Sequence, residues 1–214
     1  GALVEHWSGV GLDEFVETHI TEPLGMVDTM YNPPEHLHDR VAATSYTSSR
    51  GVIRGVVHDG NAYLLDGVAG HAGLFSTAYD LAIFAQMMLN KGVYNGNRIL
   101  ETETVELMTT NLTPEFPGND HGLGWELNQS WFMGALSGPT TMGHTGFTGT
   151  SIVVNPELQT FAILLTNRVH PTDSTPSTNP IRQAIAGHAV DAIQSANTTM
   201  MLDSIHEYAK QGVI

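Results

Sequence analysis

The chain has 214 residues, of which 41% are hydrophobic, enough for one sizeable core. Its 22 acidic residues against 8 basic ones give a formal net charge of −14 at pH 7, and such a surface repels phosphate backbones, which excludes nucleic acid as a partner. Cysteine is absent, so disulfides, thiolate metal sites and a cysteine nucleophile are excluded as well.

The first part of the chain predicts one amphipathic helix. Residues 1–4 lack the charged leader of a signal peptide, so we expect the chain to begin within a larger protein, and no apolar run reaches membrane-spanning length. From Leu12 to Ile20, apolar residues recur on one helical face. Asp13 and Glu14 lie in the first turn, where the helix dipole favours acidic groups. Glu22-Pro23 should end this helix.

Residues 27 to 70 show no sustained periodicity, and their prolines, glycines and Ser/Thr run predict mostly loop with short strands. A region of this length with so little regular pattern is often functional. Within it, His58, Asp59 and Asn61 form a cluster that could line a cleft or support catalysis. An interpretation of equal weight is that Asp59 and Asn61 only cap the loop.

A glycine-rich stretch, residues 67–77, leads into the clearest helix of the chain. Thr77 can cap this helix, with Asp80 three residues later as a variant of the capping box. Gly92 closes its end. The predicted buried stripe consists of Leu81, Phe84, Ala85, Met88 and Leu89. We interpret His71, in the glycine-rich stretch, as a structural loop histidine.

The pattern after this helix alternates turns and short elements. It predicts a turn at 94–97, a short helix at 102–108 and a short strand at 121–125. Asn179-Pro180 supplies an N-cap and a first-turn proline for an amphipathic helix that extends to Ile193. The tail from residue 195 onward either frays or adds a last helix, whose apolar positions are Leu202, Ile205 and Tyr208.

Two apolar runs, 151–155 and 161–166, follow the stretch Gly143-His144-Thr145-Gly146-Phe147-Thr148-Gly149. The turn signal Asn155-Pro156-Glu157 between them predicts adjacent antiparallel strands, with the helix from Asn179 packed across one face. The glycine-flanked His-Thr pair could be a plain turn. It could also be the edge of a cleft where backbone N–H groups are free for a ligand, and we expect His144 to face a cleft rather than the core.

Taken together, these segments resemble the serine β-lactamase and penicillin-binding-protein family, in particular its class C-like branch with DD-peptidases and esterases. His144-Thr145-Gly146 is similar to the family's [Lys/His]-Thr-Gly strand, and residues 1–26, which end in P-L-G-M, resemble another family segment. Residues 69–84 carry A-G-x-x-G-L-x-S-T-x-x-D-L-A-x-F, and residues 122–125 carry G-L-G-W.

The resemblance implies an α/β fold of the α+β type, in which an antiparallel sheet has flanking helices and forms part of a β-lactamase/transpeptidase-like fold. On this interpretation the chain, residues 1–214, is the C-terminal portion of one domain. Residues 1–110 are a helical and loop part, residues 111–194 contain the sheet strands and C-terminal helix, and residues 195–214 are the tail.

The resemblance also implies roles for the triplet and the residue after it. His144 takes the position of the Lys or His, Thr145 supplies a hydroxyl contact, Gly146 permits close backbone approach, and Phe147 provides an oxyanion N–H. His in place of Lys favours DD-peptidase or esterase members. The implied substrates are β-lactams, D-Ala-D-Ala peptides of the peptidoglycan type or esters, without cofactor or metal, and the implied location is periplasmic or secreted.

The serine and tyrosine motifs of this family are absent from the sequence. The family's nucleophile is a serine three residues before a lysine, but neither Lys91 nor Lys210 has such a serine, and no tyrosine is followed two residues later by asparagine. Ser177-Thr178-Asn179 and Ser195-Ala196-Asn197 mimic a Ser-x-Asn variant, but both follow the triplet, and we interpret them as a helix cap and a tail. We therefore expect the chain alone to be inactive.

Other interpretations stay open at this point. A non-catalytic wall-binding or interaction module would account for the lack of a nucleophile. A metal-dependent hydrolase is less favoured, and its candidate ligands are His36, His38, His58, Asp59 and His71. If sheet strands lie outside the chain, an unpaired edge favours self-association or pairing with the N-terminal part.

Overall fold

A four-stranded antiparallel sheet with the order β10-β9-β8-β7 organises the chain. The structure is a computed structural model that describes residues 1–210, with side chains for residues 1–197, 199 and 200. The strands are β7 (Glu126–Leu127), β8 (Met142–Thr145), β9 (Ser151–Asn155) and β10 (Thr160–Leu164). The predicted hairpin is confirmed, since β9 and β10 pair in register from Asn155↔Thr160 to Ser151↔Leu164.

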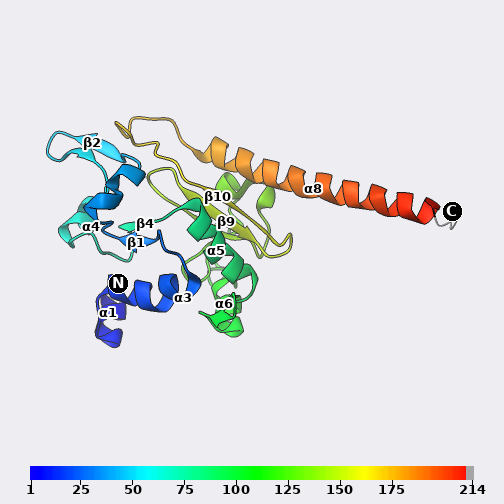
Figure 1. Ribbon diagram of the computed structural model, residues 1–214, viewed down its shortest axis with the longest axis horizontal. Coiled ribbons are helices and arrows are strands. Elements are labelled where there is room, and N and C mark those ends of the chain that lie inside the picture. Colours follow the sequence, from blue (N-terminus) through cyan, green and yellow to red (C-terminus); the bar gives the residue numbers. More distant parts are fainter. Residues whose placement is uncertain (211–214) are drawn as a thin grey trace.

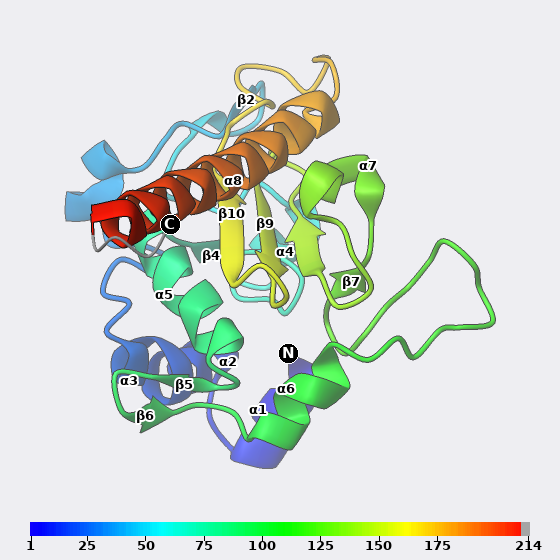
Figure 2. The same ribbon diagram turned by 90° about the vertical axis from the view of Figure 1, so that its right-hand side faces the viewer.

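Helices cover both faces of the sheet, α5 (Ala78–Leu89) on one and α8 (Asn179–Lys210) on the other (Figures 1 and 2). Because successive strand residues point to opposite faces, Val154 packs with α5 whereas Val153 packs with Ala186 of α8. The mixed α/β fold with an antiparallel sheet and flanking helices is therefore confirmed.

The predicted cap and end of α5 are confirmed. The Thr77 hydroxyl accepts a hydrogen bond from the Asp80 N–H at 3.2 Å, and Gly92, with φ of 91°, donates its N–H to the Met87 carbonyl at 2.9 Å. The buried surface differs from the predicted stripe, because Ile83 and Met87 are buried as well, whereas Leu81 and Phe84 are only partly buried. The reason is that α5 packs between the sheet and a second layer, which contributes the side chains Leu24, Met26 and Val105.

The N-terminal region differs from the prediction. It forms α1 (Ala2–Ser8), which was not predicted, then α2 (Leu12–Val16), a π-helical turn η1 (Glu17–Thr21) and α3 (Glu22–Leu24). The prediction that Glu22-Pro23 ends the helix is wrong. Proline is tolerated there because it lies in the first turn of α3, and the helix ends instead at Gly25, whose φ is 70°.

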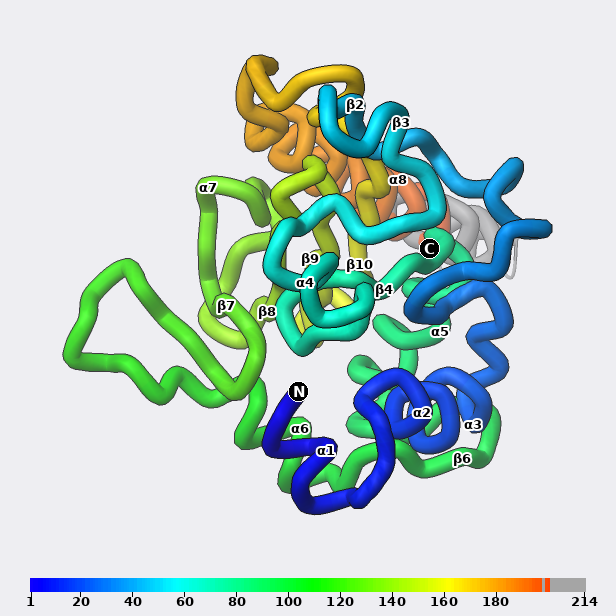
Figure 3. The backbone as a smooth tube through the Cα atoms, turned by 90° about the vertical axis from the view of Figure 1, so that its left-hand side faces the viewer, coloured from blue at the N-terminus to red at the C-terminus, as the bar shows by residue number. Residues whose placement is uncertain are grey.

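Residues 27–76 are mostly loop with short elements, as predicted, and they lie along one side of the molecule in Figure 3. β1 pairs with β4 and β2 pairs with β3, both antiparallel. The elements are β1 (Met30–Tyr31), the 3-10 helix η2 (Glu35–Arg40), β2 (Ser45–Thr47), β3 (Gly51–Ile53), α4 (Gly60–Leu64) and β4 (Leu74–Phe75).

Between α5 and the sheet, the predicted turn and short helix are confirmed as the hairpin β5 (Val93–Tyr94) and β6 (Asn97–Arg98), followed by α6 (Thr102–Met108). The predicted strand at 121–125 is wrong. Gly122 donates its N–H to the Trp125 carbonyl at 2.9 Å, which closes a turn, and the strand begins only at Glu126. Two short helices after β7 were not predicted, α7 (Ser130–Met133) and η3 (Gly134–Leu136).

The predicted helix from Asn179 is confirmed, and its backbone continues to Lys210 without a break at residue 195. Its far half extends beyond the body of the molecule in Figure 1. The proposed apolar positions Leu202, Ile205 and Tyr208 lie outside the described side chains. None of the helices in residues 1–210 combines the length and the apolar character that crossing a membrane requires.

Asp80 ties the loop before β1 to the start of α5. Its side chain is 1% exposed, and its Oδ2 accepts hydrogen bonds from the Asp28 N–H and the Thr29 hydroxyl, each at 2.8 Å. Asp80→Ala should therefore lower the free energy of unfolding by about 3 kcal/mol, because two donors lose their acceptor. Asp80→Asn, which keeps one acceptor oxygen, should cost less.

Urea unfolding of the purified protein measures this effect. The exposed Asp39 provides the matched control, and Asp39→Ala should change the free energy of unfolding by no more than about 0.5 kcal/mol. Equal losses of unfolding free energy in the Asp80→Ala and Asp39→Ala variants would contradict the structural role assigned to Asp80.

Candidate functional site

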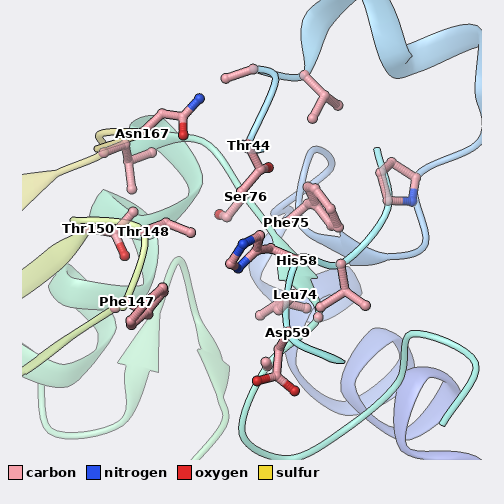
Figure 4. Close-up of a pocket in the computed structure, with 18 of the residues that line it drawn as sticks. Thr44, His58, Asp59, Leu74, Phe75, Ser76, Phe147, Thr148, Thr150 and Asn167 are labelled. Atoms are coloured by element: carbon pink, nitrogen blue, oxygen red, sulfur yellow. The ribbon is translucent and has the colours of Figure 1, made fainter. Parts of the chain in front are cut away.

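Two cavities meet at the loop that follows β8, and both are lined by Gly146 and Phe147. The large cavity has a volume of about 850 Å³ and lies between that loop and residues of the 28–77 region (Figure 4). The small cavity has a volume of about 440 Å³ and lies between the same loop and the start of α8. Its remaining lining residues are Trp131, Thr145, Arg168, Thr175, Ser177, Thr178, Asn179 and Arg182.

The His-Thr-Gly triplet runs along β8 to the junction of the cavities. His144 is exposed and pairs with Ile152, and its Nδ1 lies 3.0 Å from the carbonyl oxygen of Thr145. It lies outside the core, as expected, but it lines neither the large nor the small cavity. Thr145 lines the small cavity, and Gly146 lines both.

The backbone of the loop leaves the N–H groups of Phe147 and Thr148 without an acceptor in the described chain. Gly146 donates its N–H to the Thr150 carbonyl at 2.9 Å, and Gly149 donates to the Gly146 carbonyl at 3.0 Å. Within the part of the chain that the structure describes, the N–H of Phe147 has no hydrogen-bond acceptor. The loop therefore presents a free donor at the junction of the two cavities.

The contacts around position 146 give a structural reason for a glycine there. A Cβ at this position would lie 2.2 Å from the Thr150 hydroxyl oxygen, so a side chain here would force the Thr150 side chain out of its position. The close backbone approach that the sequence pattern suggests is thus an approach to Thr150.

Two arginines make the small cavity electropositive. Arg182 is 8% exposed and donates from Nη1 to Asn179 Oδ1 at 2.7 Å and from Nη2 to the carbonyls of Gly146 and Thr150, at 3.0 and 2.9 Å. Its Nε has no partner among the described residues. Arg168 donates from Nε to the Phe147 carbonyl at 3.0 Å.

Neither Arg168 nor Arg182 forms an ion pair with a carboxylate in residues 1–197. Burial lowers the pKa of Arg182, and the positive charge of Arg168 acts in the same direction. An anion in the small cavity would relieve both effects, so the cavity is suited to a carboxylate.

The His58, Asp59 and Asn61 cluster is divided by the fold. Asp59 caps α4 by accepting the Ala62 N–H at 2.8 Å, and it also pairs with His71 Nε2 at 2.9 Å. His58 and Asp59 line the large cavity, so for Asp59 the capping and the cleft-lining interpretations both hold. Asn61 is exposed and lines neither cavity, which corrects its assignment to the cleft.

The Asp59 carboxylate carries a pH dependence of stability. Its hydrogen bonds from the Ala62 N–H and from His71 lower the pKa of Asp59 below its ordinary value. A lowered pKa in the folded state gives stability that is present above the unfolded pKa and is lost as the pH falls through the folded pKa. Asp59→Asn should thus be less stable than the wild type at pH 7.

This deficit of the Asp59→Asn variant should shrink below about pH 4, where the wild-type carboxylate also becomes neutral. Urea unfolding of both proteins from pH 7 to pH 3 measures it. A difference in unfolding free energy that stays constant over this range would show that the charge of Asp59 contributes nothing.

The candidate metal ligands do not come together. In residues 1–197, no three His, Cys, Asp or Glu side chains are placed to hold a metal ion. His38 Nε2 lies 2.9 Å from the Pro33 carbonyl oxygen, and His71 pairs with Asp59. The metal-dependent alternative therefore lacks the ligand set that it requires.

The sequence analysis missed the two arginines and gave Asn179 only a capping role. A signal for Arg182 exists, because it lies three residues after Asn179 and next to the apolar stripe of the predicted helix. A charged residue beside a buried stripe indicates a partner or a ligand. Arg168 carries no comparable signal, since only the fold brings it to the cavity.

Comparison with known proteins bears on this site. The chain matches the family model described as Beta-lactamase over residues 1–187. A protein of Escherichia coli (strain K12) named as a D-alanyl-D-alanine carboxypeptidase is 37% identical over 199 residues, which cover 84% of this chain and 45% of that protein. An N-acetylmuramyl-L-alanine amidase of Bacillus subtilis (strain 168) is 37% identical over 199 residues, with 84% and 44% covered. The chain spans about half the length of these curated relatives.

Solved structures share the fold. A β-lactamase from Mycobacterium bovis superposes with a TM-score of 0.61 at 23% identity, covering 89% of this chain and 59% of that one. A penicillin-binding protein homologue from Pyrococcus abyssi gives a TM-score of 0.60 at 23% identity, with 91% and 40% covered. At these identities the similarity extends to the fold alone.

Proposed function

The chain belongs to the β-lactamase family, and we propose that it is the C-terminal part of a serine hydrolase that cleaves acyl-D-Ala-D-Ala peptides through an acyl-enzyme. β-Lactams and esters are the other substrates of this proposal, because the same acyl transfer opens each of them. The relatives named as D-alanyl-D-alanine carboxypeptidases support the choice of peptide.

One observation carries the proposal. At the end of the His-Thr-Gly strand, Phe147 lines both cavities and its N–H has no acceptor in the described chain, and Arg168 and Arg182 line the small cavity. A free N–H donor suits the oxyanion of a tetrahedral intermediate. An electropositive cavity beside it suits the free carboxylate with which a D-Ala-D-Ala peptide ends.

We propose the following roles for the triplet. His144 provides an electrostatic or proton-handling group, Thr145 contacts the substrate with its hydroxyl, and Gly146 keeps the loop closed on Thr150 so that the N–H of Phe147 stays exposed. Neither lysine of the chain has a serine three residues earlier. The proposed nucleophile therefore lies in sequence outside these 214 residues, within a full-length protein of the size of the relatives.

The sheet supports a role for such an additional segment. β10 is the edge strand of the sheet, so its outer edge has no strand partner in the described chain. All five of its residues are partly buried. An unpaired edge recruits another strand. We propose that this edge pairs with the N-terminal part of the full-length protein, and that the chain alone self-associates through it.

Release of D-alanine from an N-acyl-D-Ala-D-Ala peptide by the full-length protein tests the proposed function. The proposal predicts turnover of the D,D-peptide and none of the D,L-peptide as control. A non-catalytic wall-binding module, the second candidate, would bind the peptide and release nothing. Binding without release would therefore decide for that module.

A further inference from the structure

Phe147 is 62% exposed, yet two side chains contact its ring. The imidazole of His58 stacks on it, with ring centroids 5.9 Å apart and planes 13° apart. The guanidinium carbon of Arg168 lies 5.0 Å from the ring centroid. Figure 4 shows His58 projecting across the large cavity toward Phe147. An aromatic ring with so much exposed surface would otherwise rotate freely.

Hydrogen bonds fix the side chain of Arg168 and the main chain at His58. Arg168 donates its Nε to the Phe147 carbonyl at 3.0 Å and its backbone N–H to the Thr148 carbonyl at 2.9 Å. On the other side, Arg50 donates from Nη1 to the Val57 carbonyl at 3.1 Å and from Nη2 to the His58 carbonyl at 2.8 Å. These hydrogen bonds hold Arg168 against the loop and fix the backbone from which His58 projects.

The cavities on either side of the ring differ in chemistry. The charged groups of the large cavity are paired, Asp28 with Arg40 and Asp59 with His71. Its remaining wall combines apolar side chains, among them Met30, Leu37, Val41, Val57, Leu74 and Phe75, with neutral polar ones such as Thr44, Ser76, Thr148, Thr150 and Asn167. The small cavity instead has the two arginines without carboxylate partners in residues 1–197. Because Phe147 lines both cavities, we place its ring between a space without unpaired charge and a cationic one.

We propose that the Phe147 ring, contacted by His58 and Arg168, is a specificity-determining partition between two subsites, and that His58 is a positioning residue acting through it. The carboxylate-bearing leaving residue occupies the small cavity, and the acyl part of the substrate occupies the large one. This assignment of sides rests on the proposed function. The ring limits the side chain of the leaving residue, so that D-alanine fits and a bulky D-residue collides with the ring.

Binding of two small carboxylates to the full-length protein tests the partition without requiring turnover. N-acetyl-D-alanine and N-acetyl-D-phenylalanine mimic a small and a bulky leaving residue, and ligand-observed NMR titration gives the Kd of each. The wild type should favour N-acetyl-D-alanine. Phe147→Ala and His58→Ala should each shift the ratio of the two Kd values by about tenfold toward N-acetyl-D-phenylalanine.

Two further variants separate positioning from general damage. His58→Phe keeps a stacking ring, so it should retain the wild-type ratio and rescue the loss in His58→Ala. His19→Ala removes a comparable contact, the Phe15–His19 ring pair at 4.5 Å, from a helix that lines neither cavity, and should leave the ratio unchanged. Phe147→Leu replaces Phe147→Ala if the alanine variant does not fold.

The outcomes distinguish this inference from the proposed function. An unchanged ratio in the folded Phe147 variant overturns the partition, even if the wild type releases D-alanine. A ratio that shifts in the Phe147 and His58 variants, together with a wild type that releases no D-alanine, supports the partition and refutes the hydrolase. A shift in the Phe147 variant but not in His58→Ala overturns the positioning role of His58.

Discussion

Replacing His144 with alanine should lower kcat/KM of the full-length protein for an acyl-D-Ala-D-Ala peptide by about ten- to a thousandfold, with little change in stability. His144 is exposed, and the one hydrogen-bond contact of its ring within the described residues is with the carbonyl of the next residue, Thr145. Its loss therefore disturbs no packing. It does remove a polar and titratable group from the strand that leads to the free N–H of Phe147.

Steady-state kinetics and urea unfolding of the same preparations measure the His144 effect. His6→Ala serves as control, since His6 is an exposed histidine in α1 that lines neither cavity. His144→Lys, which introduces the other residue found at this position of the family's triplet, should recover most of the activity. An unchanged kcat/KM in His144→Ala would mean that the triplet is only structural in this protein.

The second large effect concerns the carboxylate of the substrate. A peptide that ends in a carboxylate should be cleaved about 10- to 100-fold more efficiently than the same peptide ending in an amide, because a charge-assisted hydrogen bond is lost in the amide. Arg182→Ala should abolish this preference. The ratio of the two peptides is the informative quantity, since Arg182 also holds the Gly146 and Thr150 carbonyls and its loss affects both substrates.

Arg182→Lys keeps the positive charge but cannot make the same forked contacts, so it should retain part of the preference for the carboxylate. Arg98 provides a control, because it lies on the exposed strand β6 and lines neither cavity. A wild-type protein that cleaves the carboxylate and amide peptides equally well would contradict the carboxylate-binding role of the small cavity.

Local signals in the sequence predict much of the fold. Thr77 and Asp80 define the start of α5, and the Asn155-Pro156-Glu157 turn defines the β9–β10 hairpin, because both depend on hydrogen bonds between residues a few positions apart. The predictions fail where contacts between residues far apart in the sequence determine the local structure. Pro23 was expected to end a helix, but the π-helical turn before it and Gly25 after it accommodate the proline within one continuous helical path.

The candidate site is likewise divided between residues that a local motif identifies and residues that only the fold brings together. His144, Thr145, Gly146 and Phe147 are contiguous, so a local motif is enough to identify them. Arg168 and Arg182 reach the small cavity from the segment after β10 and from α8, and no local pattern places them beside Phe147. His58 is distant from Phe147 in the sequence, and only the tertiary fold brings the two rings together.

The central claim is that this chain contributes the oxyanion and carboxylate sites of a serine hydrolase but not its nucleophile. Incubation of the full-length protein and of the 214-residue chain with a fluorescent penicillin, followed by intact-mass measurement, tests it most directly. We expect one covalent adduct on the full-length protein, at a serine outside this chain, and none on the chain alone. In size-exclusion chromatography the isolated chain should elute as a self-associated species. Stoichiometric labelling of the isolated chain, or no labelling of the full-length protein, would contradict it.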